Sequence, residues 1–210
     1  MDLYLFDFDE TLYNYDFRYR LPALSLVTGV SQYRLAKDWW AAGFEKRAEA
    51  GEWPTSDEYL AEFHKQTGAH LTLEQWRETR MLASTRIAGS VDALRTASTL
   101  GTVGVLTNNP SPFAESFHIL APDVAEVVGG NVLVSSDLGV RKPDAAIYRL
   151  ALERFGASPE NTFFTDDSEA NTAGAAAVGI HAYQIQWVGD TPQTAALQDA
   201  VEAFAQRTRS

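Results

Sequence analysis

The stretch LYLFDFDETL, residues 3–12, decides the fold of this chain. Its first four residues, from Leu3 to Phe6, are apolar, and they are followed closely by two acids, Asp7 and Asp9. A short apolar and aromatic run of this kind is typical of a buried strand. Because open parallel sheets bind ligands at the carboxyl ends of their strands, we expect a functional site directly after this strand.

Downstream of Gly89 the sequence alternates between helical and strand patterns. The expected strands cover residues 102–106, 132–135, 162–165 and 180–185. The expected helices cover residues 90–100, a segment that opens at Ser111-Pro112, and residues 144–155, 170–178 and 192–207. Strands that alternate with helices imply right-handed crossovers. The predicted fold class is therefore α/β, with a doubly wound, mostly parallel sheet.

Residues 13–88 have helical rather than alternating periodicity and contain two capping-box patterns, which begin at Thr55 and Thr72. We therefore predict a small all-helical domain, residues 13–88, inserted into a core of residues 1–12 and 89–210. The insert holds ten basic and ten acidic residues, whereas the core holds seven and eighteen and so carries the whole net charge of -11. This contrast indicates either that the insert and the core have different functions or that both have ordinary solvated surfaces.

Composition excludes several classes of protein. The net charge of -11 argues against a nucleic-acid-binding surface, and the longest apolar run is far below the roughly 20 residues that span a bilayer. The first residues lack a signal-peptide profile, so we expect a soluble cytoplasmic protein, monomeric or homodimeric. The chain has no cysteine, which excludes disulfides and thiolate chemistry, and its four histidines are scattered without metal-ligand spacing.

Polar side chains follow most of the predicted strands and should meet at one edge of the sheet. Besides Asp7 and Asp9, they are Thr107, Asn108, Asn109, Arg141, Lys142, Asp166 and Asp167. Four carboxylates in one place repel one another unless a counter-charge is present. A hard divalent cation resolves this, and Mg²⁺ suits a site of a few carboxylates completed by water and substrate phosphate.

Four short motifs in this order resemble the signature motifs of the haloacid dehalogenase superfamily. They are Asp7-x-Asp9-x-Thr11 with Leu12, Thr107-Asn108, Lys142-Pro143-Asp144 and Asp166-Asp167-Ser168. The helical insert after the first motif is similar to the C1-type cap of subfamily I. The resemblance covers essentially the whole chain, but only the core motifs are specific.

The resemblance implies a role for each motif residue in phosphoryl transfer. Asp7 is then the nucleophile that forms an aspartyl-phosphate, and Asp9 is the general acid and base. Thr107, Asn108 and Lys142 are implied to bind the phosphoryl group, with Lys142 also neutralising charge during transfer. The implied metal ligands are Asp7, the backbone carbonyl of Asp9, Asp167 directly and Asp166 through water. Dehalogenases of this superfamily lack the second acid, so Asp9 favours phosphate chemistry.

The insert should select the leaving group. Two groups of residues are candidates for ligand contacts, with ordinary packing as the alternative: Tyr13, Tyr15, Arg18 and Tyr19, and then Arg47, Glu49 and Trp53 around Gly51. Trp39 and Trp40 are predicted to pack. Glu10 departs from the superfamily, which frequently has glycine or asparagine at this position.

Three functions remain open at this point. The leading one is a phosphatase for a small phosphorylated metabolite, such as a sugar phosphate or nucleotide. The second is a phosphomutase, or a phosphonate hydrolase that uses a cap lysine such as Lys37, Lys46 or Lys65. The third is a non-catalytic binding protein, which we would expect to have lost Asp7 or Asp9.

Overall fold

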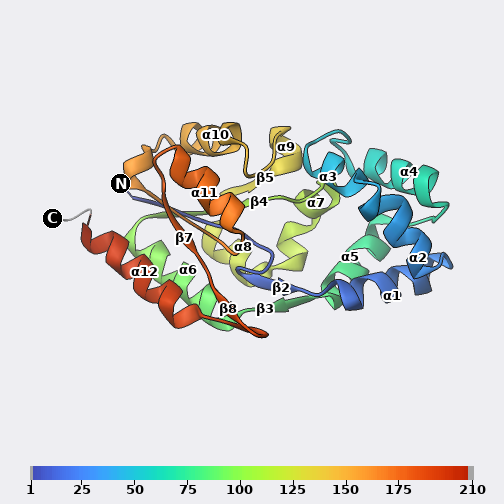
Figure 1. Cartoon of the computed structure of the whole chain (residues 1–210), viewed down its shortest axis with the longest axis horizontal. Helices are drawn as coiled ribbons and strands as arrows, with labels where there is room; N and C mark the ends of the chain where they lie inside the picture. The colour runs from blue at the N-terminus through green and yellow to red at the C-terminus, as the bar shows by residue number, and fades with distance from the viewer. Residues whose placement is uncertain (1, 208–210) are drawn as a thin grey trace.

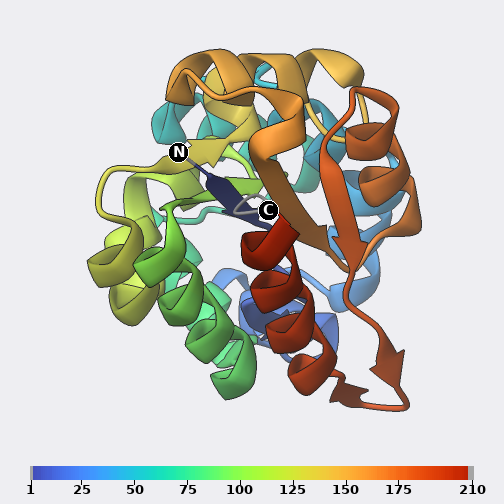
Figure 2. The same cartoon turned by 90° about the vertical axis from the view of Figure 1, so that its left-hand side faces the viewer.

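A five-stranded parallel sheet forms the centre of the larger part of the molecule (Figures 1 and 2). The structure, a computed structural model, describes residues 2–207. The strands, in spatial order, are β5 (Val132–Val134), β4 (Thr102–Thr107), β1 (Leu3–Phe6), β6 (Thr162–Asp166) and β7 (His181–Gln184). Each neighbouring pair is parallel. The predicted α/β fold and its parallel sheet are therefore confirmed.

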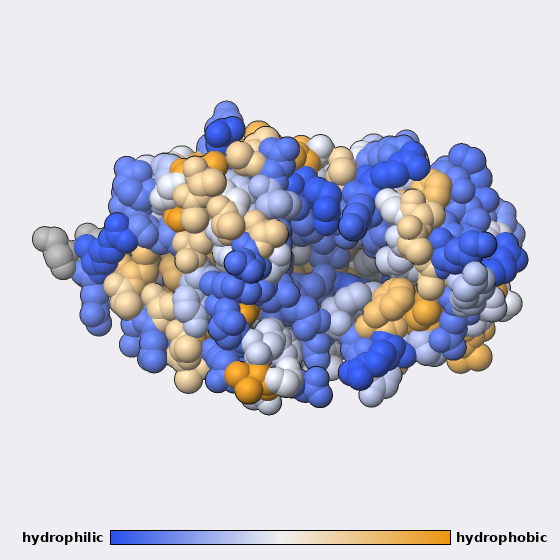
Figure 3. All heavy atoms as spheres, in the orientation of Figure 1, coloured by the Kyte–Doolittle hydropathy of each residue, from blue (hydrophilic) through white to orange (hydrophobic). Residues whose placement is uncertain are grey.

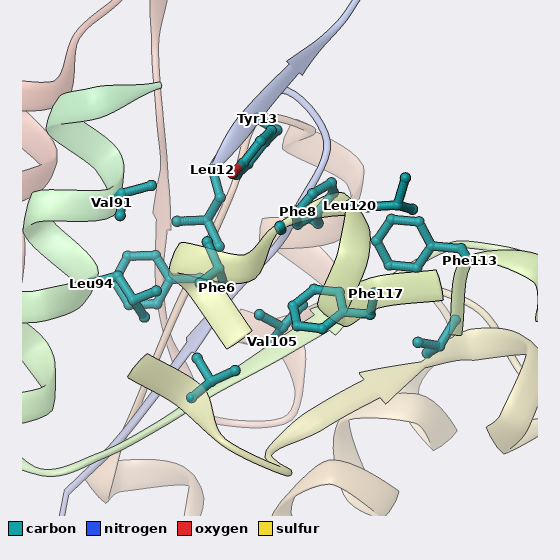
Figure 4. Packing of buried hydrophobic residues seen from close by; sticks show 14 of the residues in the cluster. Phe6, Phe8, Leu12, Tyr13, Val91, Leu94, Val105, Phe113, Phe117 and Leu120 are labelled. Atoms are coloured by element: carbon teal, nitrogen blue, oxygen red, sulfur yellow. The ribbon is translucent and has the colours of Figure 1, made fainter. Parts of the chain in front are cut away.

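Helices cover both faces of the sheet, which explains why the central strand is apolar throughout. Along β1, Leu3 and Leu5 join one apolar cluster while Tyr4 and Phe6 join the other, as the two-residue period of a strand requires. Four of the covering helices are α6 (Ala88–Leu100) and α12 (Thr194–Arg207) on the face of Phe6, and α10 (Ala145–Phe155) and α11 (Glu169–Ala177) on the face of Leu5. Figure 4 shows Val91 and Leu94 of α6 beside Phe6 and Leu12.

Further short elements complete the core. They are α7 (Ser111–Leu120), α8 (Pro122–Val128), α9 (Ser135–Leu138) and the 3₁₀ helix η2 (Pro159–Asn161). In α7, Phe113 and Phe117 pack against Phe8 of the loop after β1, with ring centroids 5.0 and 5.8 Å away (Figure 4). This apolar contact fixes the loop that carries Asp7 and Asp9.

The insert contributes a separate group of helices, which lies to the right in Figure 1. Its elements are α1 (Phe17–Thr28), α2 (Gln32–Leu35), the π-helix η1 (Ala36–Ala41), α3 (Phe44–Glu49), α4 (Ser56–Thr67) and α5 (Leu73–Leu82). Both predicted capping boxes form, at the starts of α4 and α5. Trp39 is fully buried among aromatic rings whose centroids lie 5.0–5.8 Å away, so its predicted packing role is confirmed.

The prediction that the insert is entirely helical is wrong at its two ends. The chain enters the insert through β2 (Tyr13–Tyr15) and leaves it through β3 (Ser84–Arg86), and these strands pair antiparallel. The two connections run side by side, so their backbone groups bond to each other. The domain boundaries at residues 13 and 88 stay a prediction.

A hairpin near the end of the chain was also not predicted. β8 (Trp187–Val188) pairs antiparallel with β9 (Thr191–Pro192) across Gly189 and Asp190. Gly189 has φ 60°, the left-handed conformation that a two-residue hairpin turn requires. Within residues 2–207, no helix has the length and apolar character needed to cross a membrane.

Candidate active site

Asp7 emerges from the carboxyl end of β1 and meets the buried side chain of Lys142. The Lys142 Nζ lies 2.7 Å from Oδ1 of Asp7 and 2.6 Å from Oδ2 of Asp166. It also donates to the carbonyl oxygen of Leu106 at 2.9 Å. Burial alone would lower the pKa of Lys142, but the adjacent Asp7 and Asp166 outweigh burial and raise it. Lys142 is therefore a permanent cation between two carboxylates.

Asn108 holds the backbone of Lys142 at this place. Its Nδ2 donates to the carbonyl oxygen of Lys142 at 3.0 Å, and the Lys142 N–H donates to Asn108 Oδ1 at 2.8 Å. Asn108 follows β4, while Lys142 begins the turn that leads through a cis bond to Pro143 into α10. The Thr107-Asn108 and Lys142-Pro143-Asp144 motifs are thus hydrogen-bonded to each other. The Asn108 side chain itself binds the backbone of the Lys142 loop.

Three carboxylates lie together at the same edge of the sheet. Asp7, Asp166 and Asp167 each offer one oxygen, and these oxygens lie within 4.8 Å of one another. Burial, and after it the charge of Asp166, raises the pKa of Asp7 well above its usual range and that of Asp167 to about 6. The side-chain amide of Asn171 donates to Asp166 at 3.0 Å, and the backbone N–H of Ser168 donates to it at 2.9 Å. A divalent cation would relieve the repulsion among these buried carboxylates, so the donor set fits Mg²⁺.

The carboxylate of Asp9 makes different contacts. Arg80 of α5 forms an ion pair with its Oδ1, and Asn109 Nδ2 donates to its Oδ2 at 3.0 Å. Asn109 also donates to Oγ1 of Thr107 at 2.9 Å, which leaves the proton of this buried hydroxyl for another acceptor. Two donors thus hold the second acid, one from the core and one from the insert.

Glu10 has a left-handed backbone, with φ 58°. The loop is held from two sides, because Tyr15 N–H donates to Glu10 Oε1 at 2.9 Å and Trp187 Nε1 donates to the Glu10 carbonyl at 3.0 Å. Glycine or asparagine adopts such a conformation most readily. Here the side-chain hydrogen bond offsets the cost for glutamate.

A cavity of about 420 Å³ lies between the core and the insert at this site. The residues that line it from the core include Asp7, Asp9, Thr107, Asn108, Lys142 and Asp167, and those that line it from the insert are Tyr15, Phe17, Trp40, Glu45, Glu49 and Arg80. Figure 3 shows a hollow with hydrophilic borders between the two parts of the molecule. A neighbouring open cleft of about 800 Å³ shares Glu10, Tyr15 and Asp167 with this cavity.

The insert residues that were predicted to contact a ligand lie in different places in the structure. Tyr15 and Glu49 line the cavity, while Arg18 and Tyr19 line the neighbouring cleft. Tyr13 donates its hydroxyl to Asp123 at 2.6 Å. The other candidates pack or pair elsewhere: the Trp53 ring lies against Trp39, and Arg47 pairs with Glu52.

The three cap lysines lie away from the cavity wall, whereas Trp40 forms part of it. None of Lys37, Lys46 and Lys65 is among the described residues that line the cavity. Trp40 does line it and also packs edge-on against Phe17, at 4.9 Å between ring centroids. Its predicted packing role is confirmed, but its position at the cavity was not expected.

Two side chains hold Asp9, and sequence reasoning predicted neither contact. Asn109 was expected at this edge of the sheet but was given no role, although it directly follows the Thr107-Asn108 motif. Arg80 lies 71 residues from Asp9 in the sequence, and nothing in its local pattern indicates the contact.

A model of the haloacid dehalogenase-like hydrolase family matches residues 1–179. Acyl-CoA dehydrogenase family member 10 of Mus musculus is 39% identical over 92 residues, which make up 43% of this chain and only 8% of the mouse protein. Phosphatase MT3486 of Mycobacterium tuberculosis is 27% identical over 192 residues, 89% of this chain and 88% of that protein.

Solved structures show the same fold. A HAD family enzyme from Bacteroides thetaiotaomicron superposes with a TM-score of 0.74 at 19% identity, covering 90% of this chain and 96% of that one. Another structure of that enzyme is a complex with magnesium and inorganic phosphate, with a TM-score of 0.70 at 19% identity and the same coverage.

Proposed function

The chain belongs to the haloacid dehalogenase-like hydrolase family, and from this we propose that it is a magnesium-dependent phosphatase for a small phosphorylated metabolite. The observation that carries the proposal is the buried Lys142, which contacts both Asp7 and Asp166 at the edge of the sheet. The similarity to a mycobacterial phosphatase, and to the fold of an enzyme solved with magnesium and phosphate, supports it.

In this proposal Asp7 is the nucleophile. One of its carboxylate oxygens attacks phosphorus, the bond from phosphorus to the ester oxygen breaks, and an acyl phosphate forms on Asp7. Lys142, which holds Oδ1 of Asp7, orients the carboxylate and offsets charge on the phosphoryl oxygens. The Thr107 hydroxyl, whose oxygen already accepts from Asn109, donates its proton to a phosphoryl oxygen.

Asp9 handles the protons of both half-reactions. It gives a proton to the ester oxygen as the alcohol leaves, and it then takes a proton from the water that attacks the acyl phosphate. Inorganic phosphate is released and Asp7 is regenerated. The ion pair with Arg80 and the hydrogen bond from Asn109 keep Asp9 at its place beside Asp7.

Asp7, Asp166 and Asp167 would hold Mg²⁺ together with the backbone carbonyl of Asp9. When bound, the ion would offset negative charge where the phosphoryl group docks. Lys142 and Arg80 offset only two of the four charges on the clustered aspartates, so a divalent cation completes the balance.

Of the alternatives, a phosphonate hydrolase has no support, because none of Lys37, Lys46 and Lys65 lines the described part of the cavity. A phosphomutase uses the same acids and is distinguished by a retained phosphoenzyme and a need for a bisphosphate activator. A non-catalytic binding protein is disfavoured because Asp7 and Asp9 are both present and both held in place.

The test is phosphate release from a panel of phosphorylated metabolites, measured with Mg²⁺ and with excess chelator. We expect release with Mg²⁺, loss of release with chelator, and recovery when Mg²⁺ is restored. No release from any ester would contradict the phosphatase assignment, and full activity in excess chelator would contradict the metal assignment.

A further inference from the structure

Arg80 is a buried cation on the insert side of the cavity, and the site described so far uses only part of it. Its side chain is 6% exposed, and one terminal nitrogen forms the ion pair with Asp9. Its Nε–H has no hydrogen-bond partner, although a guanidinium offers five donors in a fixed fork. Its Cζ lies 3.9 Å from the centre of the Tyr15 ring, which fixes the plane of the group. Buried donors are rarely left unused, so Arg80 has capacity for an acceptor.

The other charged groups on the insert wall already have partners. Glu49 pairs with Arg141 at 2.7 Å. Glu45 accepts from the Trp39 indole and from the Tyr59 hydroxyl, the latter at 2.9 Å. Arg80 is thus the one insert cation among the described residues lining this cavity.

We propose that Arg80 binds a carboxylate on the leaving group, so that the substrates are phosphate monoesters of small hydroxy acids. This inference rests on the proposed phosphatase function. A carboxylate matches the guanidinium fork in geometry and matches the single available cation in charge. A second phosphate fits less well, because its extra charge would face Glu45 and Glu49. The phosphoryl group itself docks on the core side, at Lys142.

Three two-carbon esters with nearly equal size test the inference: 2-phosphoglycolate, 2-hydroxyethyl phosphate and phosphoethanolamine. They differ in whether the leaving group carries a carboxylate, a hydroxyl or an ammonium. We expect kcat/KM of the wild-type enzyme with Mg²⁺ to be about tenfold or more higher for 2-phosphoglycolate, as one charge-assisted hydrogen bond predicts. Arg80→Met should abolish this preference, and Arg80→Lys should restore part of it.

Arg77→Met is the matched control. Arg77 lies on the same helix and its Nε donates to Ser116 Oγ at 3.2 Å, outside the cavity. This variant should keep the preference for the carboxylate. If Arg80 only positions Asp9, Arg80→Met will slow all three esters by the same factor, and the inference is wrong.

Further outcomes separate this inference from the proposed function. Turnover of p-nitrophenyl phosphate without a carboxylate preference in the wild type overturns the inference and leaves the phosphatase assignment standing. A preference for phosphoethanolamine also overturns it, because the insert carboxylates would then recognise the leaving group. No phosphate release from any ester, p-nitrophenyl phosphate included, overturns the proposed function and the inference with it. If Arg80→Met does not fold, the inference is tested by the wild-type preference for 2-phosphoglycolate and by the reduced preference expected in Arg80→Lys. Absence of the wild-type preference, or an unchanged preference in Arg80→Lys, overturns it.

Discussion

Asp7 and Asp9 lie two residues apart, yet the structure surrounds their carboxylates with different groups. Asp7 is buried against Lys142 and Asp166, whereas Asp9 is held by Arg80 and Asn109. Pairs of acids in different surroundings are a general device for separating a nucleophile from a proton donor. The contacts therefore support different roles for the two acids, which substitutions can test separately.

Replacing the proposed nucleophile should remove turnover. In Asp7→Asn the amide cannot form the acyl phosphate, so we expect an almost complete loss of phosphate release while the protein still folds. Beryllium trifluoride should bind to Asp7 in the wild type and not in the variant. Asp144→Asn is a suitable control, because Asn also caps helices and Asp144 only caps α10. A variant with substantial remaining activity would place the nucleophile elsewhere.

Replacing the proposed acid should slow both half-reactions. The loss in Asp9→Asn should be about 10²- to 10⁴-fold, but smaller for formation of the acyl phosphate from an aryl ester, whose leaving group needs no proton. Hydrolysis of the acyl phosphate stays slow, so phosphoenzyme should accumulate. Rapid-quench measurement of protein-bound phosphate with aryl and alkyl esters checks this. Equal slowing with both esters and no accumulation would instead indicate a structural role for Asp9.

The sequence predicts the positions of some residues of the candidate site but not of others. Asp7, Thr107 and Asp167 directly follow or end strands, so their place at the sheet edge could be expected from the strand pattern alone. Arg80 could not be, because it lies on an insert helix beside Arg77, and only the packing of the insert on the core decides which arginine reaches Asp9.

Among the elements, the β8–β9 hairpin supports the loop that carries Asp9 and Glu10, although it lies beyond the part matched by the family model. Its Trp187 donates to the Glu10 carbonyl at 3.0 Å and so helps to hold the loop between Asp9 and Tyr13. Neither this hairpin nor the β2–β3 pair could be predicted, because strands of two or three residues are too short for an alternating pattern to be recognised. The equally short β5 was predicted because it is an apolar run, VLV, within the helix–strand alternation of the core.

Removing the indole donor should therefore impair catalysis more than substrate binding. We expect Trp187→Phe to lower kcat by roughly five- to tenfold with little change in KM, the effect of one lost hydrogen bond of ~1 kcal/mol or slightly more. Val188→Thr changes an exposed neighbour in the same hairpin and should have no effect. The measurement is steady-state kinetics with an aryl phosphate. Unchanged kcat in Trp187→Phe would show that the loop does not depend on the hairpin.

At the scale of the whole molecule, the site lies where the insert faces the sheet edge, and this explains why the insert contacts were the least predictable. Glu49 lines the cavity, but Arg47 and Trp53, its neighbours around the same turn, do not. Trp53 joins the ring cluster around Trp39, and Arg47 lies over the Trp53 ring. The helical pattern could locate these residues on the insert, but not their direction relative to the core.

The acid cluster also links metal binding to the stability of the entire fold. Burial and the charge of Asp166 raise the pKa of Asp167 from 3.8 to about 6. Between about pH 4 and pH 6 the folded, metal-free protein therefore holds a proton that the unfolded chain has released. Stability falls with rising pH wherever the folded state binds more protons. The metal-free protein should thus lose stability as pH rises through this window.

Mg²⁺ should reverse this trend, because it binds the ionised carboxylates and binds only the folded state. We expect Mg²⁺ to raise Tm clearly at pH 7.5 and little at pH 5, since below about pH 6 the ion competes with a proton on Asp167 and its affinity falls about tenfold per pH unit. Thermal unfolding with Mg²⁺ and with chelator at a series of pH values measures the difference. Asp167→Asn should abolish the Mg²⁺ effect and remove the part of the metal-free pH dependence that Asp167 contributes. A Mg²⁺-induced rise in Tm of equal size at pH 5 and pH 7.5 would mean that the ion does not bind at Asp167, because binding there requires the ionised carboxylate.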